Sequence, residues 1–183
     1  MQSAIGERHC ARSEKDWKNV RGKFMKVLIV SDTHRHNDNY LKVVEKVKPL
    51  DMVIHCGDIE GSEYLIAESA GCPVQMVMGN NDFFCDLPRE KEFNIGKYKV
   101  WLTHGHTYYV SMSNEYIKRE ARERGVDIVM YGHSHRPVVD ADDGVIAINP
   151  GSLTYPRQEG RRPSFVIMEL DKDGEAHFTI NYL

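Results

Sequence analysis

The chain has 183 residues, of which 41% are hydrophobic and 28% charged, and its formal net charge at pH 7 is −3. This composition is typical of a single globular domain and excludes an intrinsically disordered chain. The weak net charge gives no reason to expect nucleic-acid or membrane binding, and no apolar stretch approaches the roughly 20 residues of a membrane-spanning helix.

The N-terminal region looks different from the rest of the chain. Its first residues are polar and lack the apolar segment of a secretory signal, which predicts a cytoplasmic location. Residues 1–24 show no helix or strand period, whereas the apolar run from Met25 to Val30 is typical of a buried strand. We therefore expect residues 1–24 to be an N-terminal extension upstream of a natural start at Met25, and residues 25–183 to form one domain.

The first half of the domain alternates strands with helices. Buried strands are predicted at 25–30, 51–56 and 74–78. One helix begins with Asn37 or Asp38 as its cap and runs to Lys48, where Pro49 stops it. A second helix is capped by Ser62 and closed by Gly71.

The second half is richer in hairpins. The pattern predicts one hairpin at 92–95 and 98–102, a charged helix at 114–124 with a solvated face, and a strand at 127–130. Further strands are expected at 138–140 and 145–148, and a last hairpin at 165–170 and 176–182. This order indicates an α/β protein with mixed sheets packed face to face and helices outside.

Histidines are concentrated just after these strands. Six of the nine occur in pairs spaced by two, each behind an apolar run: His34 and His36, His104 and His106, His133 and His135. Residues two apart in an extended segment point to the same side, so each pair can reach a common centre. This spacing is typical of metal ligands.

Seven potential ligands follow the predicted strands, and ligands of α/β sheets bind outside the carboxyl ends of strands. They are Asp32, His34, Asp58, Asn80, His104, His133 and His135. Seven exceed the four ligands of a closed zinc site. The number instead suits two ions of higher coordination number that share a carboxylate.

Five short motifs resemble the signature blocks of the calcineurin-like metallophosphoesterases. They are Asp32-x-His34, Gly57-Asp58, Gly79-Asn80-x-Asp82, His104-Gly105 and Gly132-His133-x-His135. The short length and the late segment Asn149-Pro150-Gly151-Ser152 resemble the small YfcE-like phosphodiesterase branch. The resemblance implies a four-layer α/β/β/α sandwich. It also implies that Asp32, His34 and His135 bind one ion, that Asp58 bridges, and that Asn80, His104 and His133 bind the other.

The implied activity is phosphodiester hydrolysis by in-line attack of a water or hydroxide that bridges two divalent ions. Mixed oxygen and imidazole ligands favour Mn, with Fe, Ni or Zn as alternatives. The expected substrate is a small phosphodiester, without nucleic-acid or membrane binding, and the relatives suggest a homodimer or homotetramer. The alternatives are a non-catalytic protein-interaction scaffold of the same fold, a phosphomonoesterase or a nuclease.

The leaving group needs a proton donor, and many members of this family have a histidine where this chain has Asn81. An amide cannot donate a proton as imidazolium can. We therefore expect either a preference for diesters with good leaving groups or a proton supplied by His36 or His106. For these two histidines, simple solvent exposure remains an equal alternative.

Several further residues have two interpretations. Asp82 either orients a ligand histidine or caps a loop, and residues 149–152 form either a plain turn or a loop near the metals. Arg157, Arg161 and Arg162 either clamp a substrate phosphate or, as we favour, lie on a solvated loop. His55 is expected in the core, and His9 and His177 away from the site.

Overall fold

The computed structural model describes residues 24–142 and 144–183. Of the predicted extension, only Phe24 is among the described residues, so His9 lies outside them. The start at Met25 stays a prediction. The elements follow the predicted order: β1 (Met25–Val30), α1 (Asp38–Val47), β2 (Met52–His55), α2 (Glu63–Ala70), β3 (Val74–Met76), β4 (Glu90–Ile95), β5 (Tyr98–Thr103), η2 (His106–Tyr108), α3 (Glu115–Glu123), β6 (Ile128–Met130), β7 (Pro137–Asp140), β8 (Ile146–Pro150), β9 (Ser164–Leu170) and β10 (Ala176–Tyr182).

The strands form two mixed sheets of five. The first has the order β10-β9-β1-β2-β3 and the second β4-β5-β6-β8-β7. Strands β1, β2 and β3 are parallel, as are β5, β6 and β8, whereas β9, β10, β4 and β7 pair antiparallel. The carboxyl ends of the parallel strands carry the predicted ligands.

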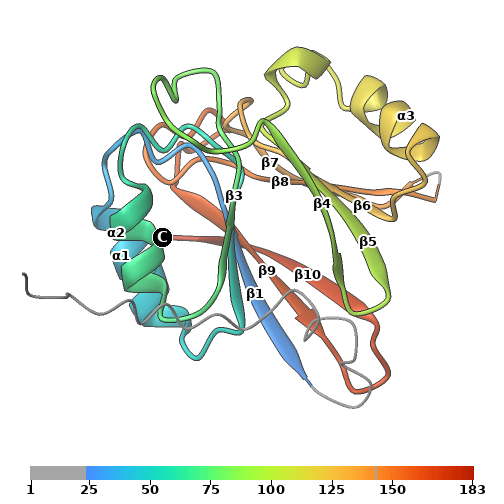
Figure 1. The fold of residues 1–183 in the computed structure, drawn as a ribbon, viewed down its shortest axis with the longest axis horizontal. Helices are drawn as coiled ribbons and strands as arrows, with labels where there is room; N and C mark the ends of the chain where they lie inside the picture. Colours follow the sequence, from blue (N-terminus) through green and yellow to red (C-terminus); the bar gives the residue numbers. More distant parts are fainter. Residues whose placement is uncertain (1–23, 143) are drawn as a thin grey trace, which may run out of the picture.

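The two sheets pack face to face, and helices cover their outer faces (Figure 1). Alternation along β1 explains the layering: Val27 and Ile29 join the core between the sheets, whereas Leu28 and Val30 pack under α1 and α2. A third cluster, which includes Trp101 and residues of α3, fills the space under that helix. The predicted four-layer α/β/β/α sandwich is therefore confirmed.

Asn37 and Ser62 are the N-cap residues of α1 and α2, as predicted, but neither makes a side-chain cap hydrogen bond. Instead the Asn37 amide donates to Ser62 Oγ at 2.8 Å. The solvated face predicted for α3 is wrong at Lys118, whose buried ammonium group donates to Asp140 at 3.0 Å.

Within the described residues, no helix is both long and apolar enough to cross a membrane.

Candidate metal centre

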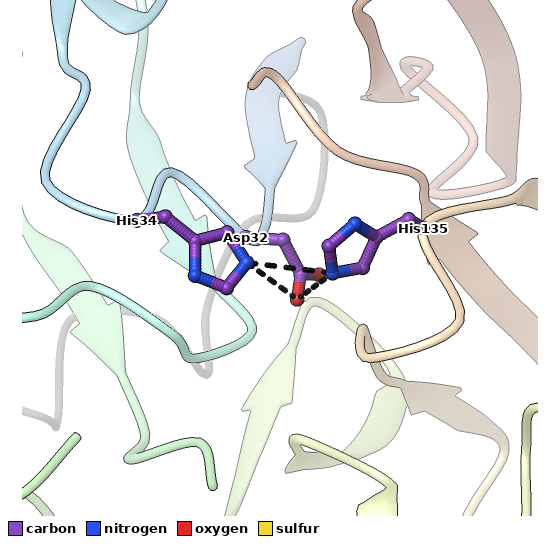
Figure 2. A group of neighbouring side chains, drawn as sticks. All are labelled: Asp32, His34 and His135. Atoms are coloured by element: carbon purple, nitrogen blue, oxygen red, sulfur yellow. Dashed lines mark hydrogen bonds and ion pairs between the residues drawn. The ribbon is translucent and has the colours of Figure 1, made fainter. Parts of the chain in front are cut away.

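Three predicted ligands converge from two sheets (Figure 2). Asp32 follows β1, and its Oδ1 lies 3.1 Å from His135 Nε2 and 3.9 Å from His34 Nε2. The two imidazole Nε2 atoms are 3.4 Å apart. The three side chains place one donor atom each within 4.8 Å of one another, which is compact enough for one ion.

A second group of possible ligands adjoins the first. Asp32, Asp58 and His104 also bring donor atoms within 4.8 Å of one another. Asp58 Oδ2 lies 3.8 Å from His34 Nε2 and 3.5 Å from His104 Nε2, so it stands between the two groups. Asn80 Oδ1 lies 3.1 Å from His104 Nε2. Asp32 is the carboxylate common to both groups, and the position of Asp58 between His34 and His104 is compatible with the predicted sharing of Asp58.

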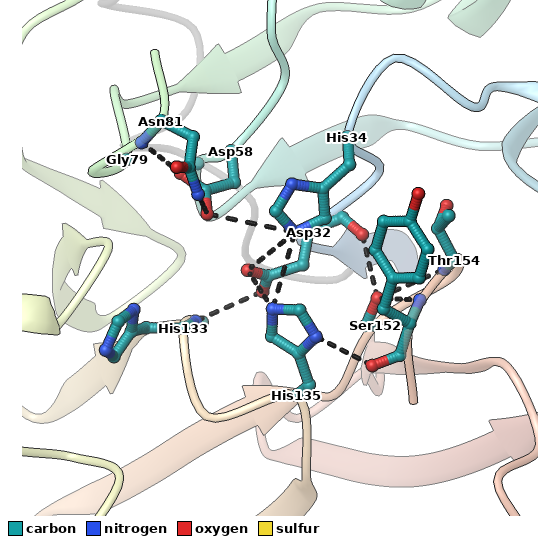
Figure 3. A network of polar contacts seen from close by, with 12 residues as sticks. Asp32, His34, Asp58, Gly79, Asn81, His133, His135, Ser152 and Thr154 are labelled. Atoms are coloured by element: carbon teal, nitrogen blue, oxygen red, sulfur yellow. Dashed lines mark hydrogen bonds and ion pairs between the residues drawn. The ribbon is translucent and has the colours of Figure 1, made fainter. Parts of the chain in front are cut away.

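His133 completes the set from the side of the second sheet. Its backbone N–H donates to Asp32 Oδ2 at 3.1 Å, and its ring centroid lies 5.3 Å from that of His104. Figure 3 shows the His133 ring on the side away from His135. The seven predicted ligands thus gather at one edge of the sandwich, and their division between two ions stays a prediction.

The ligand histidines are oriented by partners outside the centre. The Nδ1 atom bonds to Glu60 Oε1 at 2.7 Å in His34, to the Cys56 carbonyl at 2.8 Å in His104, and to the Tyr155 carbonyl at 2.7 Å in His135. Carbonyl oxygens only accept, so Nδ1 of His104 and His135 carries the proton, and the carboxylate favours the same in His34. The remaining Nε2 of each ring therefore faces the centre, as metal ligation requires.

The electrostatics leave two buried negative charges. Burial would raise the pKa of Asp32, but His135 and His104 outweigh it and lower the pKa. Burial likewise opposes ionisation of Asp58, yet His104 and Asn81 hold its pKa well below the ordinary value. Burial would lower the pKa of His104, but the two carboxylates raise it to about 8. In the absence of metal, a proton on His104 therefore supplies positive charge to the site.

The backbone of the centre is held in an unusual conformation. Five of the seven predicted ligands have φ between 45° and 64°, in the left-handed region: Asp32, His34, Asp58, His133 and His135. Each such residue costs about 1–3 kcal/mol unless its surroundings impose the conformation. The loops also pack closely here, since a Cβ at Gly79 would collide with Asp58 and one at Gly132 with Ser31 Oγ.

Asp82 organises the loops rather than a histidine. Its buried carboxylate accepts four backbone N–H groups, from Asp58, Ile59, Glu60 and Gly79, at 2.6–2.8 Å. The capping interpretation of Asp82 is therefore confirmed, and the histidine-orienting one is wrong.

The loop after β8 lies against the centre, as the resemblance implied. Asn149 donates to the Gly132 carbonyl at 2.7 Å. Ser152 Oγ donates to the Asp32 carbonyl at 2.8 Å (Figure 3). Thr154 Oγ1 donates to the Thr33 carbonyl at 2.9 Å. This loop therefore fixes two ligand loops through their backbone.

The three candidate catalytic residues are placed differently. Asn81 donates to Asp58 Oδ2 through its amide at 2.7 Å and to Oδ1 through its backbone at 2.9 Å. His106 is half-buried, 5.5 Å from His104 by ring centroids. His36 is exposed, and its ring centroid lies 5.9 Å from that of Tyr155.

Sequence reasoning missed Glu60, whose carboxylate holds His34 at 2.7 Å. Its only local signal is the spacing of two from Asp58. His55 is buried as predicted, and its Nε2 lies 3.1 Å from Thr33 Oγ1.

Comparisons with known proteins identify the family of the chain. Residues 25–173 match the family model of the calcineurin-like phosphoesterase superfamily domain. The probable metallophosphoesterase YsnB of Bacillus subtilis is 34% identical over 150 residues, which cover 81% of this chain and 86% of that protein. The phosphodiesterase MJ0936 of Methanocaldococcus jannaschii is 32% identical over 146 residues, which cover 69% and 83%.

The structure of wild-type Vps29 complexed with Zn²⁺ from Entamoeba histolytica has a TM-score of 0.69. It is 23% identical, the alignment covers 86% of this chain and 99% of that one, and the likeness shows the shared fold. The match of the family model over most of the chain shows that this protein belongs to the calcineurin-like phosphoesterase superfamily.

Proposed function

We propose that this chain is a metal-dependent phosphodiesterase that holds two divalent ions, with manganese preferred and iron, nickel or zinc as alternatives. One observation carries the proposal. Three imidazole Nε2 atoms, each on a ring fixed through Nδ1, face two buried carboxylates at the same edge of the sandwich. Rings fixed in this way favour cation binding over a solvated cluster of polar residues.

The residues present fit a bound cation. Asp32 Oδ1 is buried and receives no hydrogen bond, and the inward Nε2 atoms of His34 and His135 lie 3.4 Å apart. Facing lone pairs repel one another unless a proton or a cation lies between them. A divalent ion would satisfy the carboxylate and both imidazoles together.

Divalent ions in such a site supply a nucleophilic water at neutral pH and neutralise phosphoryl oxygens. The protein contributes orientation: Asn81 fixes both oxygens of Asp58, and Asp82 fixes the loop on which Asp58 lies. No side-chain nucleophile is required for this chemistry.

His106 is the better candidate for protonating the leaving group. It lies beside His104 and His133, whereas His36 is exposed and its ring packs against Tyr155. Burial and the neighbouring charge of His104 lower the pKa of His106, which makes it a weaker proton source than an exposed histidine. We therefore expect good leaving groups to react fastest, since a nitrophenolate departs without a proton.

The test is hydrolysis of bis(p-nitrophenyl) phosphate by metal-free protein supplemented with each divalent ion. We expect turnover with Mn²⁺, none with EDTA, and a loss of at least about 10²-fold in Asp58→Asn, because the shared carboxylate is removed. Asp86→Asn is the matched control, since this exposed carboxylate belongs to the loop after β3. No turnover with any divalent ion would refute the proposal and favour the protein-interaction scaffold.

A further inference from the structure

A cavity of about 630 Å³ opens beside the metal centre. The residues that line it are Arg136, Thr154, Tyr155, Pro156, Arg157 and Arg161. Half of these side chains are guanidinium groups, and none is acidic.

The cavity wall and a predicted metal ligand share their backbone. Arg136 directly follows His135 in the chain, and the Arg157 N–H donates to the His135 carbonyl at 3.0 Å. His135 in turn donates from Nδ1 to the Tyr155 carbonyl at 2.7 Å, and the Tyr155 ring lies 5.2 Å from that of His34. The cavity therefore lies next to the predicted ligands His34 and His135, with Tyr155 in its wall.

The charge of the cavity is uncompensated. Among the described residues, no carboxylate forms an ion pair with Arg136, Arg157 or Arg161. A cavity of about 310 Å³ that shares Thr154 and Tyr155 with the larger one is lined by Asp38 as well as by a lysine. Only the larger cavity thus presents positive charge alone.

Arg162, which follows Arg161 in the chain, has structural contacts instead. Its guanidinium lies over the Tyr182 ring at 5.1 Å and donates to the Leu183 carbonyl at 3.2 Å. Arg162 does not line the cavity. Of the three arginines considered as a clamp from sequence, two therefore face the cavity and one is occupied elsewhere.

We propose that this cavity binds a second, terminal phosphate of the substrate, so that the preferred substrates are small phosphodiesters that also carry a phosphate monoester. The inference rests on the proposed phosphodiesterase function. A monoester phosphate is close to dianionic at neutral pH and accepts the paired N–H groups of guanidinium, which match its geometry better than ammonium does. The cavity thus selects among diesters after the metal centre has selected for the scissile phosphate.

The experiment compares two substrates that differ only in this group: the p-nitrophenyl ester of thymidine 5′-phosphate, with and without a 3′-phosphate. We expect kcat/KM to be at least about tenfold higher for the 3′-phosphorylated substrate, a preference that weakens at high ionic strength. Arg136→Gln and Arg161→Gln should each lower the ratio of the two kcat/KM values about fivefold, the effect of one exposed ion pair. Arg162→Gln should leave the ratio unchanged. Equal kcat/KM values in the wild type, or an equal effect of Arg162→Gln, would overturn the proposal.

A binding measurement separates this proposal from the proposed catalysis. Thymidine 3′,5′-bisphosphate should bind to EDTA-treated protein at least about tenfold more tightly than thymidine 5′-phosphate in calorimetry. Tighter binding of the bisphosphate without any hydrolysis of diesters would refute the phosphodiesterase activity and support the phosphate site. Hydrolysis of diesters without tighter binding of the bisphosphate would support the activity and refute the phosphate site. An oligothymidylate that competed more strongly than the bisphosphate would overturn the assignment to a small substrate.

Discussion

Replacing Asp82 by asparagine tests the claim that one carboxylate holds the loops of the metal centre. Oδ1 accepts the N–H groups of Ile59 and Glu60, and Oδ2 accepts those of Asp58 and Gly79. In Asp82→Asn an NH₂ group replaces one oxygen, so two N–H groups lose their acceptor and face a donor. Two hydrogen bonds to a charged group are worth about 3 kcal/mol at the lower end of their range.

We therefore expect Asp82→Asn to lower the free energy of unfolding of the metal-free protein by about 3 kcal/mol, or the melting temperature by about 6–12 °C for a chain of this length. Urea denaturation followed by circular dichroism measures this loss. Asp86→Asn, at an exposed position four residues later, should change stability by less than about 0.5 kcal/mol. A loss below about 1 kcal/mol in Asp82→Asn would refute the reasoning, since the buried N–H groups would then have found other partners.

Three further predictions concern the centre itself. Glu60→Gln keeps an acceptor for His34 but removes its charge, so Mn²⁺ affinity should fall about tenfold in a calorimetric titration, and an unchanged affinity would contradict the orienting role. Because the pKa of His104 is raised to about 8, this ring is mostly protonated at pH 7 and must lose its proton to bind metal through Nε2. Metal binding should therefore release about one proton, measured as the dependence of the binding enthalpy on the buffer, and an enthalpy equal in all buffers would speak against it. His106→Ala should lower kcat for an alkyl diester about 10²-fold and kcat for bis(p-nitrophenyl) phosphate far less. His36→Ala should lower kcat for both substrates only weakly. Equal losses in the two variants would contradict the choice of His106 over His36 as the proton donor.

The fold and the position of the centre could be predicted because both depend on local patterns. Apolar runs indicate buried strands, and parallel strands bring their carboxyl ends to one edge of a sheet. Asp32, Asp58 and His104 follow such strands, which is why their meeting at that edge could be predicted. The helices were also found from their periodicity and their stop signals, such as Gly71 with a φ of 67°.

What escaped prediction depends on contacts between distant segments. The Ser152 hydroxyl reaches the Asp32 carbonyl across 120 residues, and no local pattern signals that bond. The positions of the caps were predicted correctly, but the missing side-chain cap bonds were not, because the Asn37 amide donates to Ser62 across 25 residues instead. Arg161 and Arg162 are adjacent and chemically identical, and only the tertiary structure separates the cavity residue from the structural one.

The left-handed backbone of the predicted ligand residues sets the proposed metal binding against stability. A side chain in that region is disfavoured relative to glycine. The packing of the sandwich must therefore offset the conformational free energy of keeping Asp32, His34 and His133 at positive φ. Exchanging any of them for glycine should relieve local strain while destroying coordination. A descendant freed from selection for metal binding could thus lose this strain at His34 or His133 and keep its architecture.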